Sequence, residues 1–271
     1  MAKSRGKPFV IKHMPGFPVI AMVCFFALYM PLVPLVIYSF NAGNNIALWE
    51  GFSFRWYSAA WENELVKAAA VRSLVVASFA SVFATILATM AALGTTRIRR
   101  YRGQTTIYAL INQPLMVPEI VTAVALLILF AMIKEATGYH GYAYLVIAHT
   151  AFCIPFAYLP IRARLEGMDK TLETAAADLY ARPWPTFTRV TLPLLLPGIF
   201  AGAMLAFVIS LDDVVITEFV KSAGQDTLPT YMLGQLRRVI TPEINAISSV
   251  LLLISVILVT LIFFLSRSKS A

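Results

Sequence analysis

Six apolar runs recur along the chain, and each is long enough to form a helix that crosses a membrane. A spanning helix needs about 20 consecutive, mostly apolar residues. The runs are approximately Phe17–Phe40, Ala69–Thr95, Thr105–Ile133, Tyr142–Ile161, Leu194–Phe219 and Ala246–Leu265. The first run holds Pro31 and Pro34 and is followed by no small-residue cleavage site, so we interpret it as a retained helix. The sequence therefore predicts an all-α, polytopic membrane protein with six transmembrane helices.

Composition and motifs exclude several classes of protein. Hydrophobic residues make up 59% of the 271 residues and charged residues 13%, whereas a soluble domain carries about 25% charged residues. The two cysteines, Cys24 and Cys153, lie in apolar runs, so neither a disulfide framework nor a metal cluster is expected. The sequence contains no G-x-x-x-x-G-K-S/T phosphate loop and no hydrolase or metalloprotease motif. We therefore expect no catalytic residues and no bound cofactor in this chain.

The distribution of lysine and arginine predicts the orientation in the membrane. With the N-terminus inside, 15 of the 22 basic residues fall on inner segments and 7 on outer ones. Basic residues accumulate on the cytoplasmic side of membrane proteins, so both termini are expected in the cytoplasm. The formal charge of +8 then reflects topology and not nucleic-acid binding.

Two outer segments have internal organisation. The segment 52–67 carries two tryptophans and a tyrosine among polar residues, which is typical of a helix lying on the membrane surface. Ser53 is the N-cap that we expect for this helix. The segment 228–243 is too short and too polar to span, so the sequence predicts either a loop or a half-inserted hairpin there.

Four acidic residues fall inside the predicted spans, namely Glu119, Asp212, Asp213 and Glu218. No lysine or arginine lies clearly within a span. Acids in this position are protonated, face water, or are neutralised by another cation, which here includes a transported one. We interpret the four residues as candidates for a substrate pathway, and they favour a cationic substrate.

Each of these acids also has a structural interpretation. Glu119 follows Pro118 and suits the first turn of a restarted helix, and Glu218 suits a solvated position near the outer interface. Asp212 and Asp213 point about 100° apart if they lie on one helix, so that one faces the pathway while the other packs or caps. His149, in the fourth run, is either a proton relay or an interhelical hydrogen-bond partner. The lack of an acid beside it in the sequence favours the hydrogen bond.

The longest inner segment, about residues 165–192, has a specific construction. Asp169 suits the N-cap of a short helix. Its apolar residues are spaced by three and four and so share one narrow stripe, formed by Leu172, Ala175, Ala176 and Leu179. A break at Arg182–Pro185 separates it from a second short helix. This pattern favours docking in a groove of a partner, and an amphipathic connector resting on lipid headgroups is the alternative.

The string LETAAADLYARPWPTFTRVTLPLLLPGI, Leu172–Ile199, resembles the EAA loop of type I ABC importer permeases. In that family the loop is a coupling helix that sits in a cleft of the cytoplasmic ATPase. The resemblance covers nearly the entire chain and implies a single permease domain over residues 1–271. The positions that it assigns to ATPase coupling are Glu173, Ala175, Ala176, Asp178, Leu179, Ala181 and Phe187.

The chain departs from the family pattern at two positions. The family almost always has glycine where this chain has Tyr180, and a left-handed residue there costs tyrosine about 1 kcal/mol. The turn is therefore expected to be either strained or differently shaped. Arg72 stands before Ser73, where many relatives have asparagine.

Four further strings are similar to the spermidine/putrescine branch of these permeases, and most of all to putrescine permeases. They are WEGFSFRWY at Trp49–Tyr57, PLMVPEIV at Pro114–Val121, SLDDVVITEFV at Ser210–Val220 and TPEINA at Thr241–Ala246. The resemblance implies a bacterial inner-membrane subunit that imports polyamines by alternating access. Its implied partners are two ATPase subunits that bind ATP and magnesium, a second, homologous permease and a periplasmic solute-binding protein.

Two other functions stay open at this point. An importer of the same class for another cationic solute, such as a basic amino acid, fits the same acids, because the receptor largely imposes substrate identity. A proton-coupled secondary transporter would use Glu119, Asp212 and His149, but such a carrier has no use for the EAA string.

Overall fold

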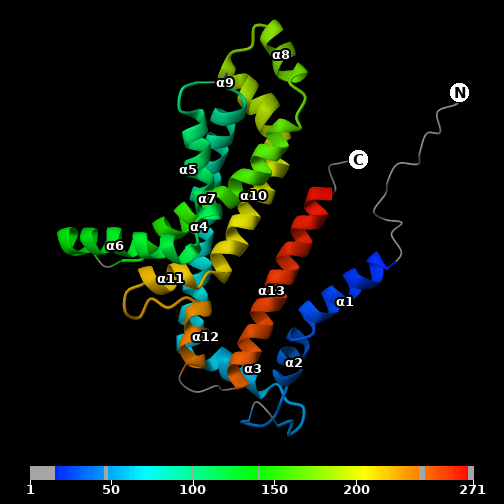
Figure 1. Ribbon diagram of the computed structural model, residues 1–271, viewed down its shortest axis with the longest axis vertical. Coiled ribbons are helices and arrows are strands. Elements are labelled where there is room, and N and C mark those ends of the chain that lie inside the picture. The colour runs from blue at the N-terminus through cyan, green and yellow to red at the C-terminus, as the bar shows by residue number, and fades with distance from the viewer. Residues whose placement is uncertain (1–15, 46–47, 99–100, 140, 238–241, 268–271) are drawn as a thin grey trace, which may run out of the picture. The chain divides into compact units, whose positions relative to one another are not determined.

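The computed structural model describes residues 16–45, 48–98, 101–139, 141–237 and 242–267. All of the regular elements in these ranges are helices (Figure 1). They are α1 (Phe17–Tyr29), α2 (Leu32–Tyr38), α3 (Arg55–Glu62), α4 (Glu64–Thr96), α5 (Gln104–Met116), α6 (Glu119–Thr137), α7 (Ala143–Glu166), α8 (Thr171–Asp178), α9 (Pro183–Thr186), the π-helix η2 (Phe187–Thr191), α10 (Leu192–Asp212), α11 (Val215–Val220), α12 (Leu228–Leu236) and α13 (Pro242–Arg267). The all-α prediction is confirmed.

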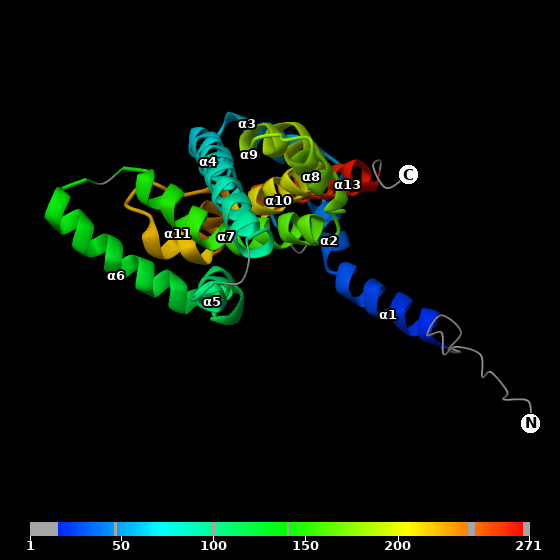
Figure 2. The ribbon, with the colours of Figure 1, turned by 90° about the horizontal axis from the view of Figure 1, so that it is seen from above.

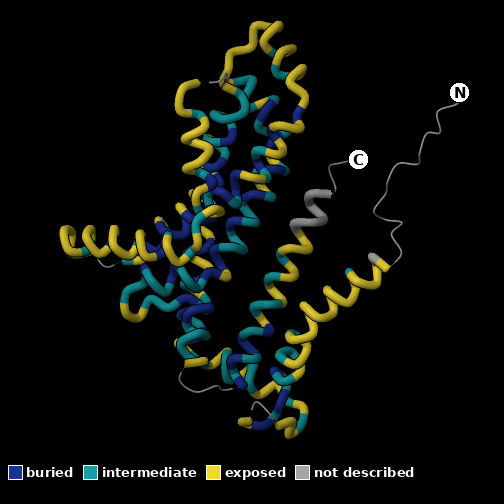
Figure 3. The backbone as a smooth tube through the Cα atoms, in the orientation of Figure 1, coloured by how far each residue is buried: buried dark blue, intermediate teal, exposed yellow. Residues whose placement is uncertain are grey.

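Six helical stretches in the described residues are long and apolar enough to cross a membrane, as predicted. Apart from α7, most residues of these stretches are not buried, and Figure 3 shows the exposed length of α6. Among the residues of α6, only Ala123 and Phe130 are buried. Exposed apolar side chains of this kind suit contact with lipid or with another membrane subunit. The cytoplasmic position of the termini stays a prediction.

The chain divides into two compact units, and the prediction of one permease domain over residues 1–271 stays untested. One unit comprises Met1–Ala60 with Ile240–Val250, and the other comprises Trp61–Val239 with Leu251–Ala271.

In the first unit, the loop between α2 and α3 is organised around Asn41, whose amide binds the Leu48 carbonyl oxygen at 2.7 Å. The surface helix expected near residue 55 is present as α3, and the Arg55 backbone N–H donates to the Ser53 hydroxyl at 3.1 Å.

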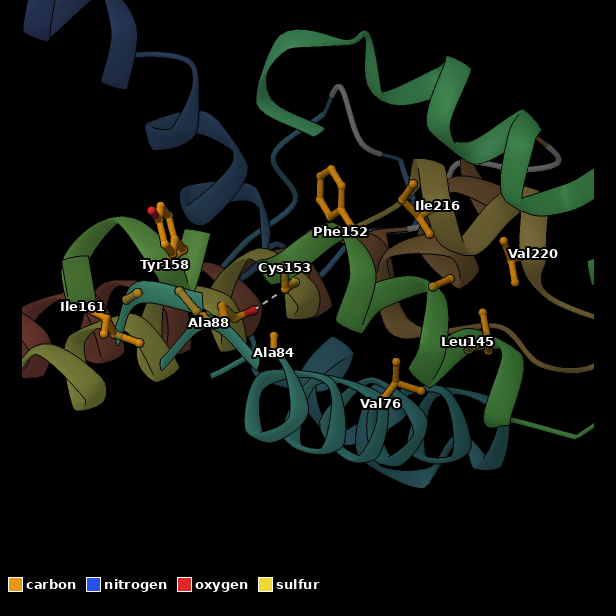
Figure 4. Close-up of a cluster of buried hydrophobic side chains, with 14 of the residues drawn as sticks. Val76, Ala84, Ala88, Leu145, Phe152, Cys153, Tyr158, Ile161, Ile216 and Val220 are labelled. Atoms are coloured by element: carbon orange, nitrogen blue, oxygen red, sulfur yellow. Dashed lines mark hydrogen bonds between the residues drawn. The ribbon is translucent and has the colours of Figure 1, made fainter. Parts of the chain in front are cut away.

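In the second unit, α4, α7 and α10 pack against one another and form the core (Figures 1 and 2). The inner face of α4 is rich in small residues that are fully buried, namely Ala69, Ala77, Ala80, Ala84, Ala88 and Ala92. Figure 4 shows Ala84 and Ala88 of this face beside Cys153 and Tyr158 of α7. Small side chains let helix backbones approach closely, which is how helices associate in lipid.

Besides the turn at Met30 and Pro31 that separates α1 from α2, two further predicted spans are interrupted, so Thr105–Ile133 and Leu194–Phe219 do not each form one continuous helix. The predicted restart of a helix at Glu119 is confirmed. The first break lies between α5 and α6, where Val117 is extended. Pro118 causes it, because proline disfavours helical geometry in the residue before it. The second break lies after α10, where Asp213 is extended and α11 begins two residues later. In Figures 1 and 2, α6 turns away from the direction of α5.

The segment predicted as a loop or hairpin over 228–243 contains the short helix α12, and residues 238–241 lie outside the described residues. Thr227 and Thr230 form a capping box at its start. The N-terminal part of α4 holds this segment: Ser73 accepts a hydrogen bond from the Leu228 N–H at 2.7 Å, and Arg72 donates to the Asp226 carbonyl oxygen at 2.9 Å. Arg72 therefore helps to anchor the start of α12.

We predict that Gly202→Ala destabilises the protein, because Gly202 is a contact point between α10 and α7. A Cβ at this position would lie 2.7 Å from the Ala157 carbonyl oxygen and 3.2 Å from Ile161. Such overpacking costs about 1–3 kcal/mol. Gly94→Ala in α4 is the matched control, because an added methyl group meets nothing within 4 Å there. Thermal unfolding of both variants in detergent tests this, and equal midpoints would contradict it.

Candidate functional site

The interruption of the fifth span is built around the carboxylate of Asp213. Its side chain is 1% exposed. One oxygen accepts from the Ile216 N–H at 3.2 Å, and the other accepts from the Thr217 N–H at 2.9 Å and the Thr217 hydroxyl at 2.8 Å. These bonds satisfy the free backbone donors at the start of α11. Asp213, a predicted pathway residue, is thus placed as the residue that caps α11.

His149 joins this cap to α7 and α10. Its Nδ1 lies 2.7 Å from the Ser210 hydroxyl, and its Nε2 lies 2.9 Å from the Thr217 hydroxyl. Because Thr217 donates its one proton to Asp213, its oxygen accepts from Nε2–H, and a neutral ring then accepts from Ser210 through Nδ1. The predicted interhelical hydrogen bond is confirmed. The sequence did not reveal that His149 has an acidic neighbour: its Nε2 lies 3.5 Å from the Asp213 carboxylate.

Glu119 and Asp212 both lie near Asp213, Glu119 through a side-chain contact and Asp212 as its neighbour in the chain. Glu119 is half-buried at the first position of α6, where the helix dipole favours an acid, and its carboxyl group is within hydrogen-bond reach of Asp213. Asp212 is the last residue of α10; it is exposed and within reach of Ser255. In the described part of the chain, neither Glu119 nor Asp212 forms an ion pair with lysine or arginine. Neighbouring carboxylates favour a nearby cation, so these acids can receive a positively charged group.

Glu218 has a different environment, and the premise that it lacks a basic partner was wrong. Its carboxylate lies 2.6 Å from the Lys221 Nζ and 3.8 Å from Arg237. Lys221 also binds Asp226 at 2.7 Å. Burial alone would lower the pKa of Lys221. The hydrogen bonds to Asp226 and Glu218 have the larger effect, so the pKa lies above its ordinary value. The cluster lines a cavity of about 550 Å³ beside α12.

The segment 165–192 forms two short helices and a π-helical turn. The Thr171 N–H donates to Asp169 at 2.9 Å, and this bond lowers the pKa of Asp169 below its ordinary value. Asp169 thus binds the first backbone N–H of α8, but the N-cap position belongs to Lys170, one residue later than predicted. At the other end of α8, the Ala181 N–H bonds to the Ala176 carbonyl oxygen and the Tyr180 N–H to that of Ala177, the two bonds of a Schellman turn.

Tyr180 adopts the left-handed conformation at this turn, with φ of 58°, and it is the one non-glycine residue with positive φ in the described chain. Of the two expectations for the turn, the strained one is therefore correct. The Tyr180 side chain is 96% exposed, beside Leu179 at 82% and Trp184 at 72%. These three large exposed side chains lie within six residues of one another on the loop, and we call them the exposed tip.

The other predicted coupling residues divide between the two sides of the loop. Ala175, Asp178 and Ala181 are exposed, whereas Ala176 and Phe187 are half-buried. Glu173 also lies on the inner side. One carboxylate oxygen accepts from the Thr191 hydroxyl at 2.9 Å, and the other lies 3.2 Å from the Arg97 Nε. The structure thus brings together Glu173 with residues from two other elements, a grouping that the sequence did not indicate.

Residues 84–268 match the family described as binding-protein-dependent transport system inner membrane component. The chain belongs to this family. It is therefore a transport subunit, a multi-pass protein of the inner membrane and an ABC importer permease, as predicted.

Two curated relatives cover most of the chain. The putrescine transport system permease protein PotI of Escherichia coli K12 is 38% identical over 237 residues, which are 86% of this chain and 84% of PotI. The spermidine/putrescine transport system permease protein PotC of Haemophilus influenzae is 35% identical over 90% of this chain and 93% of PotC.

Solved structures share the fold of this permease. A bacterial ABC transporter that imports the acidic polysaccharide alginate contains a chain with a TM-score of 0.71 at 16% identity. The match covers 94% of this permease and 97% of that chain. A chain of the MetNI methionine ABC transporter has a TM-score of 0.63 at 16% identity and covers 79% of this permease. At these identities the likeness concerns the fold alone.

We predict that Tyr180→Gly strengthens the turn after α8, because glycine adopts positive φ without a Cβ clash. Relief of about 1 kcal/mol corresponds to roughly fivefold slower hydrogen exchange at the amide of Ala181. Tyr180→Ala is the matched control, since it removes the ring and keeps the Cβ, and its exchange rate should stay near that of the native chain. Equal rates for the glycine and alanine variants would show that Tyr180 carries no strain.

Proposed function

We propose that this permease carries polyamines, putrescine or spermidine, from the periplasm to the cytoplasm in an ATP-driven importer that works by alternating access. The observation that carries the proposal is the grouping of Glu119 and Asp212 around the capped helix break, without a basic partner among the described residues. A linear polycation supplies the positive charge that these acids lack. The names of the relatives support the same substrate class.

The roles of the four acids differ in this proposal. Glu119 and Asp212 contact the passing cation, and Asp213 holds the helix break that places them. Glu218 lies in the ionic cluster at the outer end, where Lys221 and Arg237 compete with any substrate for it. A pathway that held a cation through many acids would not release it, so two contacting carboxylates are suited to transport.

The assembly that we propose contains two ATPase subunits, a second, homologous permease that forms a heterodimer with this chain, and a periplasmic binding protein. ATP and magnesium bind to the ATPase subunits, and this chain performs no chemistry. The exposed tip formed by Leu179, Tyr180 and Trp184 is the surface that docks into the ATPase. A solved alginate importer in complex with its pentasaccharide-bound periplasmic protein supports the presence of a receptor.

ATP-dependent uptake of labelled putrescine into liposomes that hold the complete importer tests the proposal. We expect Asp212→Asn and Glu119→Gln each to lower uptake about tenfold or more, because a loss of about 1.4 kcal/mol in cation binding corresponds to that factor. Glu135→Gln is the matched control, an exposed acid at the far end of α6, and it should transport normally.

Two outcomes would replace the proposal. If excess arginine or lysine abolishes uptake and excess spermidine does not, the permease serves an importer of basic amino acids. If the chain alone moves cations along a proton gradient without ATP, it is a secondary transporter.

The predicted orientation is tested with single cysteines in a chain that carries Cys24→Ser and Cys153→Ala. Ala177→Cys, on the exposed side of α8, should react with a membrane-impermeant maleimide only after the cells are opened. Ala223→Cys, in the exposed loop after α11, should react in intact spheroplasts. The reverse pattern would place both termini outside.

A further inference from the structure

We propose that Glu173 positions the coupling loop from within the chain and does not act as a contact to the ATPase. Together with Arg97 and Thr191 it forms a link that we call the Arg97–Glu173–Thr191 strut. The proposal rests on the function proposed above, because it describes how motion of the loop reaches the transport pathway.

The strut joins three elements that are far apart in the sequence. Glu173 lies in the first turn of α8, Arg97 directly follows the last residue of α4, and Thr191 ends the π-helix η2. Both carboxylate oxygens of Glu173 are engaged, one by the Thr191 hydroxyl at 2.9 Å and the other by the Arg97 Nε at 3.2 Å. The hydrogen bond from Thr191 and the ion pair with Arg97 orient the carboxylate toward the interior of the chain and not toward a partner subunit.

Local structure explains why these groups meet. In η2 the Leu192 N–H bonds to the Phe187 carbonyl oxygen, five residues earlier, so the turn is wider than an α-helical turn. Such π-helical turns often occur at functional sites. Thr191 is 5% exposed and faces Glu173 from there. Arg97 lies beside the C-terminal end of α4, where the helix dipole favours a cation.

The ion pair between Arg97 and Glu173 is shielded from water, so its loss should have a measurable effect. The side chain of Arg97 is 14% exposed and that of Glu173 is 24% exposed, whereas the pair between Arg162 and Glu166 on α7 has exposures of 30% and 54%. An exposed pair contributes little because water screens it. Removing one partner of a shielded pair leaves the other charge uncompensated.

The strut has a mechanical consequence. Thr191 is the residue directly before α10, and α10 runs without a break to Asp212. Its 21 residues form a rod about 30 Å long. A displacement of α8 is therefore transmitted through Glu173 to both α4 and the start of α10. The far end of the same rod carries Asp212 and the cap at Asp213.

Charge exchange in the complete importer tests the proposal. Arg97→Glu and Glu173→Arg should each lower ATP-driven putrescine uptake about tenfold, and the double variant should regain most of it, because the pair is restored with reversed sign. Glu166→Arg is the matched control, since it adds the same charge at an exposed position of α7 near the loop. It should leave uptake within about twofold of the native importer.

The number of putrescine molecules carried per ATP hydrolysed separates positioning from folding. Thr191→Val should lower this ratio while the amount of folded, assembled importer stays constant, and Thr191→Ser should restore it, because serine keeps the hydroxyl group. If the charge-reversed chains fail to fold, Glu173→Gln and Glu173→Ala replace them. Glutamine keeps an acceptor for Thr191, so it should retain a higher ratio than alanine.

The results distinguish this proposal from the function on which it rests. If the native importer shows no ATP-driven uptake, the proposed function fails. If the native importer is active and the double variant is as inactive as Glu173→Arg while folded and assembled, then Glu173 acts on the ATPase and the strut is overturned.

Discussion

The close packing of α4 against α7 and α10 is the interaction on which the rest of this structure depends. Lipid tails are as apolar as leucine, so the hydrophobic effect does not hold helices together in a bilayer, and association relies on van der Waals contact. The buried alanines of α4 and Gly202 of α10 provide that contact by letting backbones approach. The helix break capped by Asp213 contacts α7 through His149, and the Arg97–Glu173–Thr191 strut contacts the end of α4 through Arg97.

The polar groups at the break between α10 and α11 follow from a second constraint. Backbone donors inside a bilayer have no water to bind, so a helix is interrupted only where side chains satisfy them. Asp213 does this for α11, and His149, Ser210 and Thr217 complete the network across three elements. Asp213, which the sequence offered as a pathway residue, therefore has a structural role. Asp212 and Glu119 are the acids that can bind a cation.

The loop after α7 has two faces with different tasks. Its exposed face carries Leu179, Tyr180 and Trp184, and its inner face carries Glu173, held by Arg97 and Thr191. Tyr180 keeps the left-handed turn that glycine would adopt freely, so an exposed aromatic ring stands at the tip although the backbone is strained. Such an arrangement suits a loop that meets a partner on one side and transmits displacement through the other.

The sequence by itself determined the all-α class, the six spans and the family, because bilayer thickness fixes the length of an apolar run and the EAA string is specific. It also indicated that Ser53 and Asp169 bind the first backbone N–H groups of α3 and α8, within one residue of the predicted cap position, since such contacts are local. The pair of Glu218 with Lys221, three residues apart, is local. Only the tertiary structure showed the pairs of Glu173 with Arg97 and of His149 with Asp213, because these residues are distant in the chain. Helix packing sets such distances, and no local pattern records them.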